Sequence, residues 1–158
     1  MRILVASDTH GNENALLSAL VEQPEAKVVF HLGDGAREAE AMAAAFPDRT
    51  FYIARGNGDW GVGSGAVEAG LELVAGRRLF YTHGHRYEVK LGLTRVVYAA
   101  RERGADVLLF GHTHQPLVDY EDGLHLLNPG SLTYGEGTYG VIDITPAGVV
   151  PRIVRRRS

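Results

Sequence analysis

Two histidines spaced one residue apart follow a short apolar run near the middle of the chain. Residues 107–110 are Val-Leu-Leu-Phe, and Gly111, His112, Thr113 and His114 come directly after them. An apolar run bounded by glycine is typical of a buried strand, and in an extended chain residues two apart point the same way. We therefore expect His112 and His114 to share one face at the carboxyl end of a strand, where open α/β sheets bind ligands. A pair of surface histidines in a loop is the alternative.

Four other apolar runs end in groups of the same chemical kind. Residues 3–6, 28–30, 51–54 and 77–81 are followed respectively by Asp8 with His10, by Asp34, by Asn57 and by His83. Divalent cations accept this mixture of carboxylate, amide and imidazole donors. Seven candidate ligands exceed the four of one tetrahedral zinc site, so two ions sharing a carboxylate fit the number better.

Each of these residues also has an ordinary structural explanation. Asp8 could cap the helix that follows it, Asn57 could be a turn residue, and His83 could be a core histidine with its hydrogen bonds satisfied. Their coincidence at five strand ends favours the metal site over three separate structural roles.

Composition narrows the classes of function that remain. The chain has 158 residues and no cysteine, which excludes thiolate metal sites, disulfides and a cysteine nucleophile. The net charge of -3 makes nucleic acid an unexpected partner, and the basic tail of Arg152, Arg155, Arg156 and Arg157 is expected to be solvated. A chain of this length is most simply a single domain over residues 1–158. Because it has no long apolar run and no signal pattern, we expect a cytoplasmic protein without a membrane segment.

Strand and helix patterns alternate in the first third of the sequence. Strand runs at 3–6, 28–30 and 51–54 alternate with helical spacing at 14–21 and 36–46, which predicts a largely parallel sheet covered by helices. A hairpin over 66–74 and 77–81, a helix over 91–103 and a strand before Gly111 come next. Two further hairpins are expected, over 117–120 with 124–127 and over 139–144 with 149–154. These elements predict an α/β fold in which a second sheet packs on the first.

The motifs at the strand ends occur in a characteristic order along nearly the whole chain. They are Asp8-Thr9-His10, Gly33-Asp34, Gly56-Asn57-Gly58-Asp59, His83-Gly84-His85 and Gly111-His112-Thr113-His114, followed by the turn Asn128-Pro129-Gly130-Ser131. In this series the sequence resembles the calcineurin-like metallophosphoesterases, specifically their small bacterial and archaeal phosphodiesterase branch. The resemblance implies a four-layer α-β-β-α sandwich of two mixed β-sheets flanked by helices.

The resemblance also implies an activity and a site. One ion would be held by Asp8, His10 and His114, and a second by Asn57, His83 and His112, with Asp34 bridging; the catalytic set would be Asp34, Asn57, Asp59, His83 and His112. Two divalent ions would polarise the phosphoryl oxygens and bind a bridging hydroxide as the nucleophile. Mn²⁺ is the expected ion, with Ni²⁺, Fe²⁺, Fe³⁺ or Zn²⁺ as alternatives. The expected activity is hydrolysis of a small phosphodiester, or of a phosphomonoester.

One position departs from the family pattern. Many relatives have His between the Asn and Asp of the third motif, and the small branch often has Cys, whereas this chain has Gly58. The usual general acid is therefore absent, which predicts a preference for substrates with good leaving groups. His31 and His85 are candidate substitutes, although a structural role is the simpler expectation for each. Asp59 is expected to support the loop around Asn57.

Three alternatives remain at this point. A non-catalytic scaffold that binds protein partners is the main rival, because the phosphoesterase-like subunit of the retromer coat shares this architecture with altered metal ligands. Residues 56–61 also spell G-x-G-x-x-G, but the glycine-rich segment 62–65 is not expected to start the helix that dinucleotide binding requires. Edge strands in the C-terminal half could pair two copies into a homodimer.

Overall fold

The first of two β-sheets contains both ends of the chain. The computed structural model describes residues 1–61 and 65–157, and its first sheet has the strand order β10-β9-β1-β2-β3. Strands β1 (Arg2–Ala6), β2 (Ala26–His31) and β3 (Thr50–Ile53) are parallel. Strands β9 (Thr138–Thr145) and β10 (Gly148–Arg155) form a hairpin whose first strand runs antiparallel to β1. The sheet is therefore mixed, as predicted.

The second sheet has the strand order β4-β5-β6-β8-β7. Its centre is parallel and consists of β5 (Arg77–Thr82), β6 (Val107–Leu109) and β8 (Leu124–Asn128). Strands β4 (Ala69–Val74) and β7 (Leu117–Glu121) pair antiparallel with β5 and β8 at the two edges. The strands β7 and β10 are edge strands, and their pairing between two copies of the chain stays a prediction.

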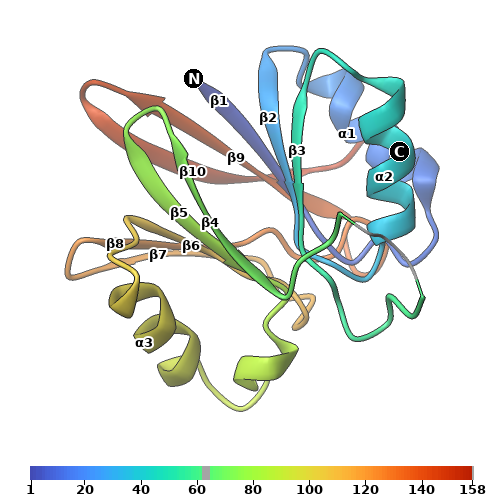
Figure 1. The fold of residues 1–158 in the computed structure, drawn as a ribbon. Helices are drawn as coiled ribbons and strands as arrows, with labels where there is room; N and C mark the ends of the chain where they lie inside the picture. The colour runs from blue at the N-terminus through green and yellow to red at the C-terminus, as the bar shows by residue number, and fades with distance from the viewer. Residues whose placement is uncertain (62–64, 158) are drawn as a thin grey trace.

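Helices cover the outer faces of both sheets (Figure 1). Helices α1 (Glu13–Glu22) and α2 (Ala36–Ala45) pack on the first sheet, and α3 (Thr94–Glu102) packs on the second. Side chains alternate along β1: Leu4 and Ala6 contact the helix layer, whereas Ile3 and Val5 face the second sheet. Three apolar layers therefore separate four structural layers, which confirms the predicted sandwich.

The predicted elements are all present, with shifted boundaries. The helix expected from residue 91 begins at Thr94, because residues 85–87 form a short 3-10 helix and Gly92 has a φ of 152°. The strand expected from residue 66 begins at Ala69, and only Val67 makes an isolated bridge to Ala54. The next described element after the G-x-G-x-x-G segment is strand β4 and not a helix, and residues 62–64 lie outside the described range. None of the described helices has the length and apolar character needed to span a membrane.

The carboxyl ends of the parallel strands from both sheets meet at one place. The Asp8 N–H donates to the Gly33 carbonyl at 2.9 Å, which joins the loops after β1 and β2. The Gly111 N–H donates to the His83 carbonyl at 3.0 Å, which joins the loops after β5 and β6. The fold therefore gathers five loops from distant parts of the sequence, and these loops contain the candidate ligands.

Candidate metal centre

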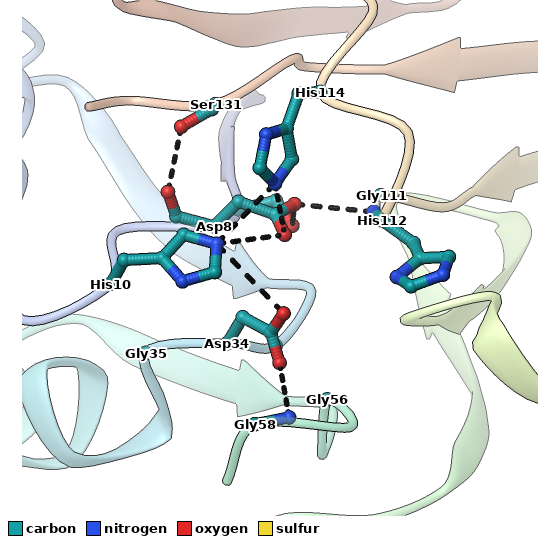
Figure 2. Close-up of polar contacts among 12 residues, drawn as sticks. Asp8, His10, Asp34, Gly35, Gly56, Gly58, Gly111, His112, His114 and Ser131 are labelled. Atoms are coloured by element: carbon teal, nitrogen blue, oxygen red, sulfur yellow. Dashed lines mark hydrogen bonds and ion pairs between the residues drawn. The ribbon is translucent and has the colours of Figure 1, made fainter. Parts of the chain in front are cut away.

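Two groups of one aspartate and two histidines lie side by side at the meeting point of the loops. One group is Asp8, His10 and His114, and the other is Asp34, His83 and His112, with one ligand atom of each residue within 4.8 Å of the others in its group. Figure 2 shows Asp8 and Asp34 with His10 and His114 around a common centre. These six residues are the predicted ligands other than Asn57.

The backbone at these residues adopts a conformation that side chains rarely accept. Five of the predicted ligands have positive φ, and they account for five of the eight non-glycine residues with positive φ in the described chain: Asp8, His10, Asp34, His112 and His114. Left-handed conformations cost free energy in ordinary residues, and they concentrate at functional sites. Positive φ at these five residues is the pattern expected where the backbone conformation sets the direction of a functional side chain.

The expectation that His112 and His114 extend a strand and share one face is wrong. Strand β6 ends at Leu109, and the chain then turns through φ values of 70° and 62° at His112 and His114. His112 consequently lies in the Asp34 group and His114 in the Asp8 group. One short motif therefore supplies a ligand to each group.

Asp8 is fully buried and has one oxygen without a hydrogen-bond partner. Its Oδ2 accepts hydrogen bonds from the Ser7 hydroxyl and from the His112 backbone N–H at 3.2 Å. Its Oδ1 is buried and makes none, although His114 Nε2 lies 3.2 Å away and His10 Nε2 3.5 Å away. A buried carboxylate oxygen without a donor is costly, and a cation at this point would compensate for it.

Asp34 lies between the two groups. Its Oδ1 accepts a hydrogen bond from the Gly58 N–H at 2.7 Å, while its Oδ2 lies 3.4 Å from His83 Nε2 and 3.8 Å from His10 Nε2. Burial opposes the charge, but the interaction with His83 and the Gly58 N–H hold the pKa of Asp34 below its ordinary value. The carboxylate is thus kept ionised with one oxygen directed at imidazoles of both groups.

The hydrogen bonds of His83 set which of its nitrogens is available. His83 is fully buried, and its Nδ1 lies 2.7 Å from the Leu32 carbonyl oxygen, an acceptor, so Nδ1 carries the proton. Nε2 then faces Asp34 Oδ2 at 3.4 Å and His112 Nδ1 at 3.1 Å, and it carries the ring's lone pair whenever the ring is neutral. Burial opposes a charge on His83, but its bond to Asp34 and the charges of Asp8 and Asp34 raise its pKa. Burial and the nearby His83 lower the pKa of His112 to about 4.

The arrangement of nitrogens fits a pair of cations. His83 Nε2 lies 3.1 Å from His112 Nδ1, and His10 Nε2 lies 3.3 Å from His114 Nε2. Each pair must hold something positive between its lone pairs, either a proton or a metal ion. Together with the unpartnered Asp8 Oδ1, the donor set of carboxylate oxygen and imidazole nitrogen suits borderline divalent ions.

Asp59 does not contribute its side chain to either group but orients the loops. Its Oδ2 accepts the N–H groups of Asp34 and Gly56, and its Oδ1 accepts those of Gly35 and Ala36, all within 3.1 Å. The expected support of the loop around Asn57 is present. Asn57 itself is exposed and lines a neighbouring cavity, so its role as a ligand stays a prediction.

Sequence reasoning gave no individual role to several residues behind the ligands. The Ser131 hydroxyl donates to the Asp8 carbonyl at 2.8 Å, as Figure 2 shows, and the Asn128 amide donates to the Gly111 carbonyl at 3.2 Å. Tyr134 stacks on the His114 ring with centroids 5.5 Å apart. The turn at residues 128–131 was a signal for the first two, since it belongs to the motif series, whereas no pattern marks Tyr134.

The histidines outside the two groups are His31, His85 and His125. His31 is fully buried, accepts the Gly33 N–H at Nδ1 and bonds the Thr9 hydroxyl at 3.1 Å, so it is structural and not a substitute acid. His125 of β8 packs against Tyr120 of β7 in the second sheet, 4.6 Å between ring centroids. His85 lies beside the His83 ring, 5.4 Å between centroids, and a role for it stays a prediction.

Comparisons with known proteins agree with this geometry. Residues 1–146 match the model of the calcineurin-like phosphoesterase superfamily domain. The chain is 35% identical over 134 residues to the probable metallophosphoesterase YsnB of Bacillus subtilis, covering 84% of this chain and 75% of that protein. It is 30% identical over 168 residues to the phosphodiesterase YfcE of Escherichia coli, covering 90% and 88% respectively.

Solved structures resemble the fold along its full length. A conserved protein of Streptococcus pneumoniae, described as a predicted phosphoesterase, superposes with a TM-score of 0.76 at 23% identity, covering 97% of both chains. Vacuolar protein sorting 29 of Cryptosporidium parvum superposes with a TM-score of 0.74 at 16% identity, covering 99% of this chain and 98% of the other. At these identities the likeness concerns the fold alone.

Proposed function

Because the chain belongs to the calcineurin-like phosphoesterase superfamily, we propose that it is a phosphodiesterase that works with two divalent metal ions. The observation that carries the proposal is the pair of adjacent Asp-His-His groups, with the Asp34 carboxylate directed at histidines of both. One Asp-His-His group alone could bind a single ion with a purely structural role. Two groups in contact are the arrangement expected where two ions act on one substrate.

The proposed ligands follow from the groups. Asp8, His10 and His114 would hold one ion, and His83 and His112 the other, with Asp34 as the bridge and Asn57 completing the second set. Mn²⁺ is the proposed ion, because carboxylate and imidazole donors suit it. Ni²⁺, Fe and Zn²⁺ are compatible with the same donors. When bound, such a pair of ions polarises a phosphoryl group and lowers the pKa of water so that it can attack phosphorus.

The residues of the chain prepare the site for that chemistry. The Leu32 carbonyl fixes the His83 tautomer, and the Gly58 N–H fixes Asp34 so that one oxygen remains free. Asp59 ties the loops after β2 and β3 together through four backbone N–H groups. The site is therefore held in shape before substrate arrives, which reduces the reorganisation required in the reaction.

Gly58 sets the proposed preference among substrates. A Cβ built at this position would lie 3.1 Å from Asp34 Oδ1, so a side chain here would lie against the proposed bridging carboxylate. Glycine has no proton to give from a side chain to a leaving oxygen. We therefore expect aryl and other activated phosphodiesters, whose leaving groups need little protonation, to react best.

A scaffold that binds protein partners is the second candidate. Its support is the similarity to vacuolar protein sorting-associated protein 29 of Schizosaccharomyces pombe, 34% identical over 86 residues, covering 54% of this chain and 46% of that protein. The loss of a general-acid side chain at Gly58 is compatible with a weak or absent activity. The intact set of Asp and His ligands favours the enzyme.

Metal content and turnover together test the proposal. The purified protein should bind two Mn²⁺ per chain by elemental analysis and hydrolyse bis(p-nitrophenyl) phosphate. Asp34→Asn should lower kcat by roughly 100-fold or more, since metal activation is worth several kcal/mol. Asp119→Asn, at an exposed carboxylate of β7, is the matched control and should leave both readings unchanged. Two bound ions without turnover of any phosphoester would favour the scaffold, and no bound metal would overturn both the ligand assignment and the enzyme.

A further inference from the structure

A cavity of about 490 Å³ opens beside the metal centre. His10, Asp34 and Gly58 form the part of its wall that belongs to the centre, and Arg37 and Trp60 line it as well. Because the cavity begins at the proposed metal ligands, any group attached to a phosphate bound there could extend into it. The residues farther from the metals therefore bear on which substrates fit.

Among the residues that the structure describes, Arg37 is the only lysine or arginine that lines this cavity, and it makes no ion pair with a carboxylate. Three carboxylates also line the cavity, and each is already engaged. Asp34 belongs to the proposed metal centre, Glu38 Oε2 accepts the Thr9 hydroxyl and the Gly11 N–H, and Asp59 accepts four backbone N–H groups. Among the described residues Arg37 has no ion pair and no hydrogen bond to its guanidinium. The cavity thus contains one exposed cation that has no partner in the described part of the chain.

A second arginine at the same helical position shows the contrast. Arg37 is the second residue of α2, and Arg95 is the second residue of α3. A cation in the first turn of a helix is unfavourable, because that end carries partial positive charge. Arg95 offsets this with an ion pair to Glu88 at 2.8 Å, whereas Arg37 has no such compensation. An unfavourable charge at a helix end, with no partner to offset it, is expected where the residue binds a ligand.

Trp60 is the only tryptophan of the chain, and its side chain is exposed. Its exposed fraction is 86%, and it lines both this cavity and a second one of about 340 Å³, which Asn57 and His85 also line. Packing does not account for an indole in this position. An exposed indole beside a phosphate site offers a face on which a planar ring can stack.

We propose that Arg37 and Trp60 form a recognition subsite for a nucleotide-type phosphoester, whose planar base stacks on Trp60 and whose second phosphate pairs with Arg37. The subsite rests on the proposed function, because the phosphate to be cleaved is placed at the metal centre. Guanidinium groups bind phosphate through two parallel hydrogen bonds, which gives both charge and direction. The structure thus assigns a substrate class to the cavity: a small phosphodiester with a base and an additional phosphate.

Fluorescence of the single tryptophan tests the subsite without any turnover. Metal-free protein is titrated with thymidine 3′,5′-bisphosphate and, separately, with thymidine. The bisphosphate should quench Trp60 fluorescence in a saturable manner and bind more tightly than thymidine. Arg37→Gln should raise its dissociation constant by roughly 10- to 100-fold, the loss expected for hydrogen bonds to a charged group. Arg95→Gln is the matched control and should behave as the unchanged protein.

Turnover then tests the same subsite in the metal-loaded protein. The p-nitrophenyl ester of thymidine 5′-phosphate is compared with the same ester bearing a 3′-phosphate, since the two share a leaving group and differ by one anion. The 3′-phosphate should raise kcat/KM in the unchanged protein and in Arg95→Gln, and not in Arg37→Gln. Trp60→Ala should raise KM for both thymidine esters, and Trp60→Phe should restore it.

The outcomes separate this proposal from the activity itself. Absence of turnover with every ester, together with Arg37-dependent quenching, would overturn the phosphodiesterase and leave the subsite supported. Equal quenching by the bisphosphate in the unchanged protein and in Arg37→Gln, or no effect of the 3′-phosphate on kcat/KM, would overturn the subsite.

Discussion

The Asp59 side chain holds the backbone of Asp34 in place through a hydrogen bond of 2.8 Å from the Asp34 N–H to Asp59 Oδ2. The same oxygen accepts the Gly56 N–H, also at 2.8 Å. One buried carboxylate therefore joins the loop after β2 to the loop after β3. The position of the proposed bridging ligand depends on a residue that binds no metal itself.

Asp59→Asn should weaken metal binding although it removes no ligand. An amide can accept hydrogen bonds through only one of its two terminal atoms, so backbone donors near Asp34 lose their acceptor. We expect Mn²⁺ affinity to fall roughly 10- to 100-fold, as for other residues that orient ligands. The free energy of unfolding should fall by about 1–3 kcal/mol for the buried donors left unpaired. Calorimetric titration and urea unfolding measure the two effects.

The matched control for this change is Asp48→Asn, because Asp48 is exposed and forms a surface ion pair with Lys27 at 3.2 Å. It should alter unfolding by less than about 1 kcal/mol and leave metal affinity unchanged. Normal Mn²⁺ affinity in Asp59→Asn would show that the ligand loops keep their shape without this carboxylate.

Replacing one histidine from each group should remove the ions separately. His114→Ala takes an imidazole from the Asp8 group, and His112→Ala takes one from the Asp34 group. Each variant should retain about one Mn²⁺ per chain under conditions where the unchanged protein holds two, because the other group keeps its own donors. Elemental analysis after gel filtration gives the count. His125→Ala, in β8 of the second sheet, is the control. An undiminished metal content in both ligand variants would contradict the assignment.

Gly58→His should help poor leaving groups most. The Cβ position points toward Asp34, so an imidazole there would reach the site and could protonate a departing oxygen. General-acid assistance is worth roughly 10²- to 10⁴-fold, and it matters least for phenolates of low pKa. A plot of log kcat against leaving-group pKa for a series of aryl phosphodiesters should become shallower. Gly58→Ala is the control, because it adds a Cβ at the same position but no group that can donate a proton, and it should leave the slope unchanged. An unchanged slope in Gly58→His would contradict the proposed effect of Gly58 on leaving-group preference.

The sequence predicted the convergence of the ligands better than their local conformation. Parallel strands have their carboxyl ends at one edge of a sheet, so groups that follow five strands could be expected to meet. The turn at His112 and His114 was not predicted, because the spacing of apolar residues carries no information about whether φ is positive or negative. Hydrogen bonds to distant residues, including the one that the His112 N–H donates to Asp8 Oδ2, stabilise that turn. Arg37 and Trp60 were likewise invisible as a pair, since nothing in their spacing indicates that both line one cavity.

The buried His31 should make the protein less stable as the pH falls below neutrality. Its ring bonds Thr9 and Gly33, one in each of two ligand-bearing loops, and burial lowers its pKa below the ordinary value of 6.5 despite the nearby carboxylates. Between 6.5 and that lower value the unfolded chain binds a proton that the folded chain does not. The free energy of unfolding attributable to His31 is therefore complete above pH 6.5 and is lost as the pH falls, by at most about 1.4 kcal/mol per pH unit.

The variant His31→Asn isolates this contribution, because Asn can still accept the Gly33 N–H but does not titrate. It should be less stable than the unchanged protein at pH 8, where the Thr9 bond is lost, and the difference should shrink toward pH 5. Urea unfolding in EDTA at half-unit pH steps measures both proteins, and the contributions of all other residues are common to the two and cancel in the comparison. A stability difference that stays constant from pH 8 to pH 5 would mean that His31 accepts its proton in the folded chain as readily as in the unfolded one.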